Sequence, residues 1–306
     1  MAASANSASM RLLGTVGAFA LTSGAVNPAL AQSDDIPILP DPEILPGPKV
    51  RPDKTVFDGD YAIVGVGVLS APTYEGSDKN RIIPAAGVSG EVGGIGFTLR
   101  GPSLSLDLLK DKPGQKVGLR FGPQVRLRSM RTGKIGDPVV ARLGELDNVI
   151  EAGVRVGVSF DEVLSKADGL SVGVSARWDV SGKGSGQVIT PSATYLLPIS
   201  RAQAFGFTAS AQFTDGKYAR YNYSISPEGS AASGLPIYDA KGGLQEISFG
   251  VATARDLSGD FLDGGFAVGA GLMYSRLYGS AAKTPITSIR GDRDQWMFGG
   301  GVTYTF

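Results

Sequence analysis

The stretch KVGLRFGPQVRLR, residues 116–128, decides the fold class of this chain. Every second position is apolar, and the positions between carry lysine, glycine, glutamine or arginine. Successive side chains of a strand point to opposite faces of the sheet, so the pattern predicts a strand with one apolar face and one polar face. The apolar members are Val117, Leu119, Phe121, Pro123, Val125 and Leu127, and the others are Gly118, Arg120, Gly122, Gln124, Arg126 and Arg128.

The same alternation recurs in segments 150–160, 170–180, 205–213, 266–274 and 296–306. A soluble sandwich would alternate in the same way, because one face of each of its sheets is buried. The aromatic residues favour a membrane barrel, since they fall near the expected strand ends, where interfacial girdles form. These residues are Phe160, Trp178, Tyr195, Phe205, Tyr274, Trp296 and Phe306. We therefore predict an all-β protein, a transmembrane antiparallel up-and-down β-barrel.

Turn signals predict about twelve strands, an even number that places both termini on the periplasmic side. The expected strands begin near Asp60, Arg81, Gly94, Pro102, Gln115, Asn148, Gly169, Gly186, Arg201, Leu244, Gly264 and Asp294. Pro123 and Pro191 lie inside two of them, where the missing N–H costs a ladder hydrogen bond. A bulge at each would accommodate them, whereas ten strands result if they end strands. The long links 71–80, 129–147, 215–243 and 278–293 are expected outside the cell.

The N-terminus carries the pattern of an export signal. Arg11 precedes an apolar stretch, and Ala29-Leu30-Ala31 matches a cleavage site, so residues 1–31 are expected to be a signal peptide. Residues 32–59 are rich in proline, which forbids helix and sheet ladders and favours an extended arm. We expect this arm in the periplasm, as a tether or as a docking peptide, and the barrel over 60–306 in the outer membrane of a Gram-negative cell.

The amino-acid composition argues against several classes of function. The 29 basic and 29 acidic residues balance, which gives no basic excess for nucleic acid. The chain has no cysteine and no histidine, so disulfides, Ser-His and Asp-His chemistry and imidazole ligation of a metal are excluded. We expect no enzyme activity, no cofactor and no metal site.

Charged residues fall on the inward parity of three consecutive expected strands. This lumen charge wall comprises Arg120, Arg126, Arg128, Glu151, Arg155, Arg177 and Asp179. Adjacent strands lie about 4.8 Å apart, so long inward side chains can pair. The wall either fills and closes a modest lumen or selects an anionic or zwitterionic solute.

The longest expected loop is rich in tyrosine and basic residues. Its binding candidates are Lys217, Tyr218, Arg220, Tyr221, Tyr223 and Tyr238, with Lys241 beside them. Aromatic and arginine enrichment is typical of binding surfaces and would suit sugar recognition. The alternative is that the tyrosines cover the barrel mouth, or that the basic residues meet phosphates of lipopolysaccharide.

The last strand ends the chain on an aromatic residue. Trp296, Tyr304 and Phe306 share the outward parity and are predicted to form the signal that the barrel-assembly machinery recognises. Outer-membrane lipid and lipopolysaccharide are the other expected partners. The opposite parity places Gln295, Met297, Thr303 and Thr305 inward.

Four segments resemble the MipA/OmpV family, which includes the MltA-interacting protein. They are PTYEGS (72–77), SGLPIY (233–238), GSAAKTPI (279–286) and GGGVTYTF (299–306). The resemblance implies a barrel of ten to twelve strands. For the best-known member it implies a scaffold joining a lytic transglycosylase to a penicillin-binding murein synthase, while other relatives serve adhesion, osmotic or antibiotic responses. In the last loop relatives tend to carry an acidic run where this chain has GSAAK, which argues against a cation-linked role there.

Two functions follow from these observations. The first is a non-enzymatic scaffold or interaction protein linked to murein-remodelling enzymes. The second is a small-solute channel with a cationic lumen wall.

Overall fold

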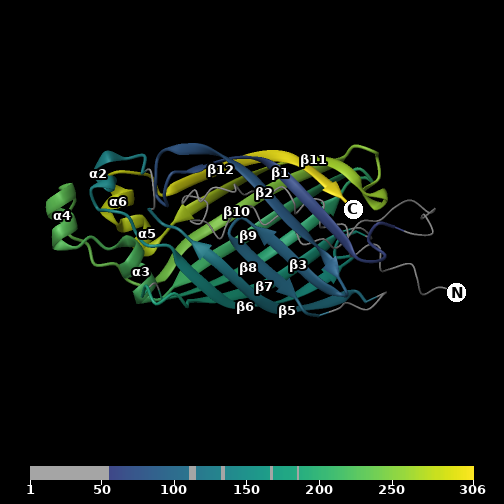
Figure 1. Cartoon of the computed structure of the whole chain (residues 1–306), viewed down its shortest axis with the longest axis horizontal. Coiled ribbons are helices and arrows are strands. Elements are labelled where there is room, and N and C mark those ends of the chain that lie inside the picture. Colours follow the sequence, from purple (N-terminus) through teal and green to yellow (C-terminus); the bar gives the residue numbers. More distant parts are fainter. Residues whose placement is uncertain (1–54, 110–114, 132–134, 166–167, 185) are drawn as a thin grey trace.

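The computed structural model describes residues 55–109, 115–131, 135–165, 168–184 and 186–306. In these residues twelve antiparallel strands close into a barrel, each beside its neighbours in the sequence (Figure 1). The prediction of twelve strands is confirmed, and each strand begins within two residues of its expected start. The strands are β1 (Tyr61–Pro72), β2 (Asn80–Val92), β3 (Ile95–Arg100), β4 (Ser103–Asp107), β5 (Val117–Arg128), β6 (Val149–Asp161), β7 (Gly169–Asp179), β8 (Gln187–Pro198), β9 (Gln203–Thr214), β10 (Gly243–Asp256), β11 (Gly265–Leu277) and β12 (Asp294–Thr305).

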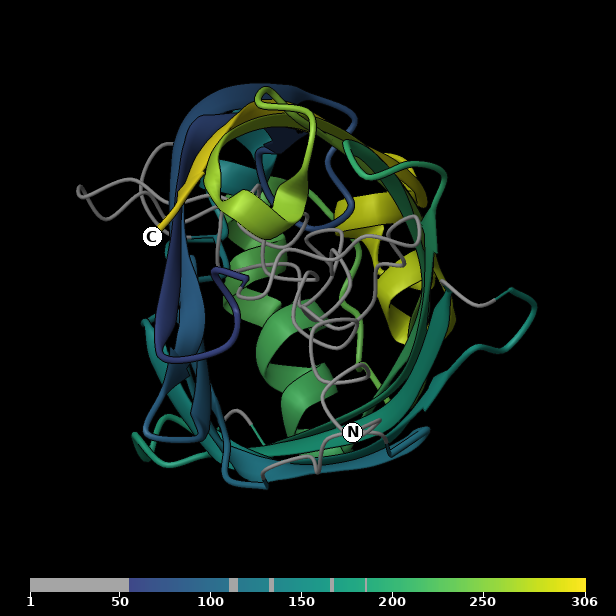
Figure 2. The same cartoon turned by 90° about the vertical axis from the view of Figure 1, so that its right-hand side faces the viewer.

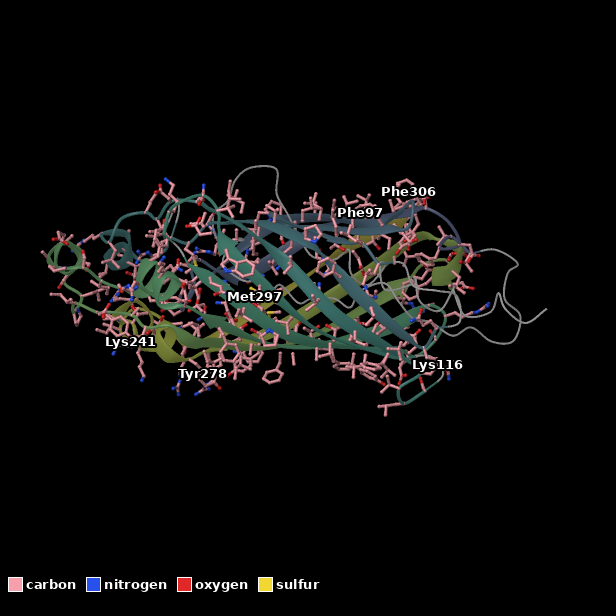
Figure 3. The ribbon with its side chains drawn as sticks, turned by 90° about the horizontal axis from the view of Figure 1, so that it is seen from below. Phe97, Lys116, Lys241, Tyr278, Met297 and Phe306 are labelled. Atoms are coloured by element: carbon pink, nitrogen blue, oxygen red, sulfur yellow. The ribbon has the colours of Figure 1, made fainter. Side chains whose placement is uncertain are left out.

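The two faces of each strand match the alternation in the sequence. On β1, Val66 and Val68 are exposed on the outer surface, whereas Ile63 and Leu69 are buried in the lumen. Phe97 and Phe306 project from the outside of the barrel (Figure 3). The parity expected for β12 is confirmed, because its inward residues are buried. These are Gln295, Met297, Thr303 and Thr305.

The bulges expected at the two prolines are absent from the described ladders, so that prediction was wrong. Pro123 pairs with Val154 of β6, while the ladder from β5 to β4 stops one residue away. Pro191 pairs with Val174 of β7, while the ladder from β8 to β9 lapses there and resumes in the same register at Ser192. Each strand thus gives up pairing toward one neighbour at the residue that lacks an N–H. The register shift that the structure does show lies at Gln245, between β9 and β10.

The β3–β4 hairpin is much shorter than the other strands. Its strands have six and five residues, against 13 in β2. Only the second half of β2, from Gly87 onward, pairs with β3. The four residues Ile82, Ile83, Pro84 and Ala85 therefore have ladder partners on β1 alone among the described residues.

The two ends of the barrel differ (Figure 1). The C-terminus and the short turns lie at one end, here called the turn end, and the long links lie at the other, the helical end. The helices of the long links are α2 (Pro138–Ala141), α3 (Gly216–Tyr223), α4 (Pro227–Ser233), α5 (Gly279–Lys283) and α6 (Pro285–Ser288). In the described part of the chain no helix is long and apolar enough to cross a membrane.

These short helices were not predicted, because none is long enough to show a helical period in the sequence. Local capping explains α3 and α4. Asp215 accepts a hydrogen bond from the Tyr218 N–H, and Ser226 accepts one from Gly229. Pro227 begins α4 at a position where its missing N–H costs nothing.

An apolar cluster lies in the lumen near the turn end. The segment before β1 contributes Phe57, and the β10–β11 turn folds the short 3₁₀ helix η2 (Phe261–Asp263) over the mouth (Figure 2). The Val56 N–H donates to the Leu262 carbonyl at 3.0 Å, which joins the two segments. The members of this turn-end cluster are Phe57, Tyr61, Ile63, Leu196, Ala204, Ala252, Ala254, Phe261, Leu262 and Ala267.

The signal peptide expected over 1–31 lies outside the described residues. The same is true of the proline-rich arm, 32–59, up to residue 54. Both assignments stay predictions.

Candidate functional site

The helical end of the barrel is covered by the five helices of the long links, here called the helical plug (α2 to α6), and α4 projects beyond the strands (Figure 1). Seen along the barrel, α3 and the helices of the last link lie within the outline of the wall (Figure 2). Two apolar clusters bind the plug together. One comprises Met130, Val188, Tyr218, Ala219, Tyr223, Ala240, Leu277 and Ala281, and the other Tyr74, Val140, Ile225, Leu235 and Ile286. They combine residues of the strand ends with residues of the links, so the plug is packed against the wall.

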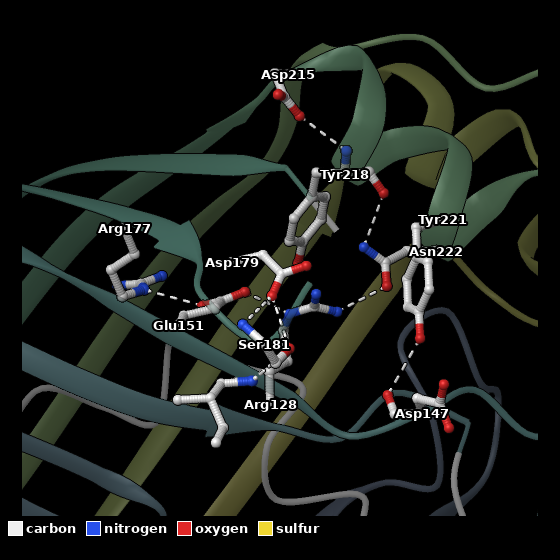
Figure 4. A network of polar contacts seen from close by, with 11 residues as sticks. Arg128, Asp147, Glu151, Arg177, Asp179, Ser181, Asp215, Tyr218, Tyr221 and Asn222 are labelled. Atoms are coloured by element: carbon white, nitrogen blue, oxygen red, sulfur yellow. Dashed lines mark hydrogen bonds and ion pairs between the residues drawn. The ribbon is translucent and has the colours of Figure 1, made fainter. Parts of the chain in front are cut away.

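Arg128, on the inner face of β5, ties the plug to the wall. Its Nε donates to Glu151 Oε1 of β6 at 2.6 Å, and its Nη1 donates to Asn222 Oδ1 of α3 at 2.7 Å (Figure 4). Its guanidinium also lies over the ring of Tyr218, 4.7 Å from the centroid. Asn222 in turn donates to the Tyr218 carbonyl at 2.8 Å. One cation therefore joins two barrel strands to the helix that covers the lumen.

Glu151 uses its second carboxylate oxygen on the next strand. Arg177 of β7 donates from Nε to Glu151 Oε2 at 3.2 Å and from Nη1 to Ser175 Oγ, also at 3.2 Å. Arg128 is 1% exposed and Glu151 is 2% exposed. A charge buried to this extent is tolerated when it is paired and hydrogen-bonded, and both oxygens of Glu151 are satisfied in that way.

The remaining members of the predicted lumen charge wall also face inward, with different surroundings. Arg126 is buried, and Arg120 lies 3.5 Å from Asp107 of β4. Asp179 accepts hydrogen bonds from the N–H and the hydroxyl of Ser181, at the turn after β7. Arg155 is half-buried near the middle of β6. The structure therefore brings Arg128, Glu151 and Arg177 into direct contact and leaves Arg155 apart from them.

The tyrosines of the longest loop divide into two groups. Tyr218 and Tyr223 are 1% and 3% exposed, because α3 turns them into the lumen. Their burial agrees with the alternative in which the tyrosines cover the barrel mouth, and sugar recognition by this loop stays a prediction. Tyr221 and Tyr238 are half-buried. Three basic residues remain on the exterior of this loop, namely Lys217, Arg220 and Lys241.

Several residues of the plug could not be found from the sequence. Glu75 accepts a hydrogen bond from the Tyr223 hydroxyl at 2.6 Å. Asn222 completes the Arg128 network, and Gln245, at the register shift, donates to the Lys241 carbonyl and accepts from the Ala281 N–H. Glu75 lies in the PTYEGS segment that resembles the family, so this resemblance could have pointed to it. Asn222 and Gln245 stand in no motif, and their contacts depend on how the links fold together.

The first and last links are locked to α2 by Tyr74 and by an ion pair. Arg290 Nη2 lies 2.6 Å from Asp137 Oδ2, and Asp137 also caps α2. Burial acts to raise the pKa of Asp137, but hydrogen bonds from Arg290, Val140 and Val139 outweigh it and lower the pKa. Burial raises the pKa of Tyr74 to about 12, with Asp137 adding to the effect. The same cause raises the pKa of Tyr223 well above its ordinary value.

These buried phenols make the plug sensitive to alkaline pH. In the unfolded loop a tyrosine loses its proton near pH 10, whereas Tyr74 in the plug holds it to about pH 12. The folded plug therefore binds more protons between these values, and its stability falls as the pH rises from 10 toward 12. We expect limited proteolysis to cut the links faster in this window. The variant Tyr74→Phe should reduce the acceleration, and Tyr278→Phe, at an exposed ring, should not change it.

The contacts of the described residues support closure of the lumen at the helical end. Among the described residues no group of acidic side chains is placed to hold a metal. The charges at the helical end pair with one another across the plug.

On the outer surface the aromatic residues of the last strands stack on one another. Tyr304 contacts Phe266 and Phe306, in both cases with ring centroids 4.7 Å apart, and Tyr274 lies 4.8 Å from Trp296. Trp296 and Phe306 are 50% and 65% exposed, as a lipid-facing surface requires. Their role in assembly stays a prediction.

The closed antiparallel sheet, its apolar exterior and its filled lumen define the class: the chain is an outer-membrane β-barrel protein. The model of the family described as "MltA-interacting protein MipA" matches residues 64–306. The chain therefore belongs to the MipA family, and the resemblance stated from the sequence is confirmed. Comparison with curated proteins gives no match.

Solved structures that are similar to this chain are also outer-membrane proteins. OmpT of Vibrio cholerae has 10% identity and a TM-score of 0.34, with 74% of this chain and 65% of that chain covered. An anion-selective porin from Comamonas acidovorans has 10% identity, a TM-score of 0.33 and coverages of 81% and 98%. The toluene transporter TodX of Pseudomonas putida has 11% identity, a TM-score of 0.34 and coverages of 98% and 96%. At these scores the likenesses carry no argument about function.

Proposed function

We propose that this chain is a non-conducting outer-membrane barrel that works as an interaction protein linked to murein-remodelling enzymes. The observation that carries the proposal is the helical plug. Buried apolar clusters and the Arg128 network close the helical end, and the turn-end cluster narrows the other end. A barrel built in this way acts through its surfaces instead of through a water-filled pore.

The orientation follows from the lengths of the connections. In outer-membrane barrels the short turns face the periplasm and the long loops face outward. The turn end is then periplasmic, and Phe57, inside the turn-end cluster, marks where the proline-rich arm joins the barrel. An extended arm beside the periplasmic mouth suits the capture of a soluble enzyme. The family description names MltA as an interaction partner, and we propose a lytic transglycosylase of this kind as the first partner and a penicillin-binding protein as the second.

Catalysis forms no part of the proposal. The chain has no histidine, so the hydroxyl or carboxylate activation that barrel hydrolases use has no base here. Both oxygens of the buried carboxylate Glu151 are engaged by arginines. Binding is the activity that remains.

Deleting residues 32–51 tests the scaffold. We expect the shortened chain to form a heat-modifiable barrel as the full chain does, and to lose most of its capture of a purified lytic transglycosylase. Deleting twenty residues from the barrel itself would disrupt its strands and cannot serve as the control. The control variants are therefore Lys217→Ala and Arg220→Ala, which change exposed residues at the opposite end of the barrel and should leave capture unchanged. Undiminished capture by the shortened chain would refute the role of the arm.

Planar bilayers test the channel alternative with the same purified protein. A plugged barrel is expected to give no stepwise conductance. Steady conductance that changes when Arg126 is replaced by glutamate would instead establish the channel and overturn the non-conducting reading.

A further inference from the structure

Arg155 stands in a patch of the inner wall that is cleared of other side chains. Along β6 its inward neighbours are Gly153 and Gly157. Directly across, Gly122 of β5 lies on one side and Ser175 of β7 on the other. Three of the four adjacent positions thus carry no side chain that could pair with the guanidinium.

The neighbouring charges are engaged with one another, and Arg155 is not. Glu151 is held by Arg128 and Arg177, and Asp107 lies beside Arg120. The Ser175 hydroxyl accepts a hydrogen bond from Arg177. Within the described residues Arg155 makes no ion pair and no side-chain hydrogen bond. All five of its N–H donors are therefore open to a ligand.

The lumen is accessible at this level, in contrast to the helical end. Arg155 and the inward hydroxyl residues Ser171, Ser175 and Ser192 are half-buried, whereas Arg128 and Glu151 are buried. Solvent therefore reaches the patch from inside the barrel, between the helical plug and the turn end.

The local charge is positive. The inward charges of β4 to β7 are Arg120, Arg126, Arg128, Arg155 and Arg177 with Asp107, Glu151, Asp161 and Asp179. Asp161 and Asp179 are the last residues of β6 and β7, so they lie at the ends of the barrel. The middle of this wall is left with more arginines than carboxylates, in a space where the wall excludes much of the screening water.

We propose that Arg155 is the centre of an oxyanion-binding site in the lumen. Its planar fork matches a carboxylate or phosphate group, which it binds through two parallel N–H···O hydrogen bonds. The hydroxyl of Ser175 on the adjacent strand β7, and that of Ser192 one strand further on β8, supply further polar groups. This site goes beyond the interaction role, which concerns the surfaces of the barrel.

Isothermal titration of the purified full-length protein in detergent tests the site, with inorganic phosphate in one series and succinate in another. We expect saturable uptake of one anion per barrel. Arg155→Gln should weaken it at least about tenfold, and Arg155→Lys, which keeps the charge but loses the fork, should weaken it less. Arg255→Gln removes an exposed arginine of β10 and is the matched control. The series that binds identifies the chemistry as phosphate, carboxylate or both.

Two results would overturn the site. One is equal affinity of Arg155→Gln and the unchanged chain, and the other is the absence of binding by the unchanged chain in both series. The electrophoretic mobility shift on boiling verifies that each variant is folded. If Arg155→Gln does not assemble, the comparison of Arg155→Lys with the unchanged chain tests the site. Neither result affects capture of the transglycosylase, so this site and the proposed interaction role fail independently.

Discussion

Replacing Glu151 by alanine is expected to lower the free energy of unfolding of the barrel by about 3–5 kcal/mol. The substitution removes the carboxylate that holds Arg128 at 2.6 Å and Arg177 at 3.2 Å. Both guanidinium groups then remain buried without their shared partner, and the desolvation of each is no longer offset. The decrease in the free energy of unfolding is measured by urea titration in detergent micelles. The folded fraction is monitored by the electrophoretic mobility of unboiled and boiled samples. Because Arg128 also holds Asn222, links 215–242 should become accessible to protease in the same variant.

The matched control breaks an exposed ion pair nearby. Lys183 lies 3.0 Å from Asp147, with side chains 43% and 65% exposed. Asp147→Ala should therefore cost less than about 1 kcal/mol, since water replaces the lost contact. If Glu151→Ala were as mild as Asp147→Ala, the network would not be what fastens the plug to the wall.

Replacing Gly153 by alanine is expected to prevent assembly of most of the protein. The added Cβ would lie 1.9 Å from the Ala176 carbonyl oxygen and 2.8 Å from Arg177 Cα. Both atoms belong to the backbone of β7, so no side chain can rotate away, and the cost exceeds the about 1–3 kcal/mol of ordinary overpacking. Glycines at such positions let the wall bend sharply at the barrel's corners. The fraction of heat-modifiable barrel in isolated outer membranes measures the effect.

Gly59→Ala provides the comparison, because a Cβ built there meets nothing within 4 Å. We expect normal levels of folded barrel from this variant. Normal levels from Gly153→Ala as well would mean that β6 and β7 lie farther apart than the structure places them.

The strands were predictable because membrane and lumen impose opposite demands on alternate residues. In β5 and β12 apolar and polar residues alternate along the strand, and the inward and outward assignments made from this alternation are confirmed. Even β3 and β4 were found from their turn signals. The bulges were wrong because a proline can also be accommodated by a lapse in pairing toward one neighbour. Pro191 shows this, with the register unchanged on either side.

The plug could not be predicted from the same reasoning. Its helices have four to eight residues and contact one another across links far apart in the sequence, as Glu75 and Tyr223 do. The residue pattern within one segment does not predict contacts between segments that are far apart in the sequence. The inward parity of Arg128, Glu151 and Arg177 was visible, but their pairing depended on the length of the side chains and on α3. The burial of Tyr218 followed from the same helix.

The short β3–β4 hairpin has a consequence for the lipid around the barrel. Among the described residues Ile82 to Ala85 have ladder partners on β1 alone, and hydrocarbon offers an unpaired backbone group no hydrogen bond. Pro84 removes one donor from this edge, and the others require water or lipid headgroups. We expect lipid headgroups to approach the barrel beside β2, which would make the bilayer thinner there than around the remaining wall. A neighbouring protein sensitive to bilayer thickness would then meet the barrel on that side.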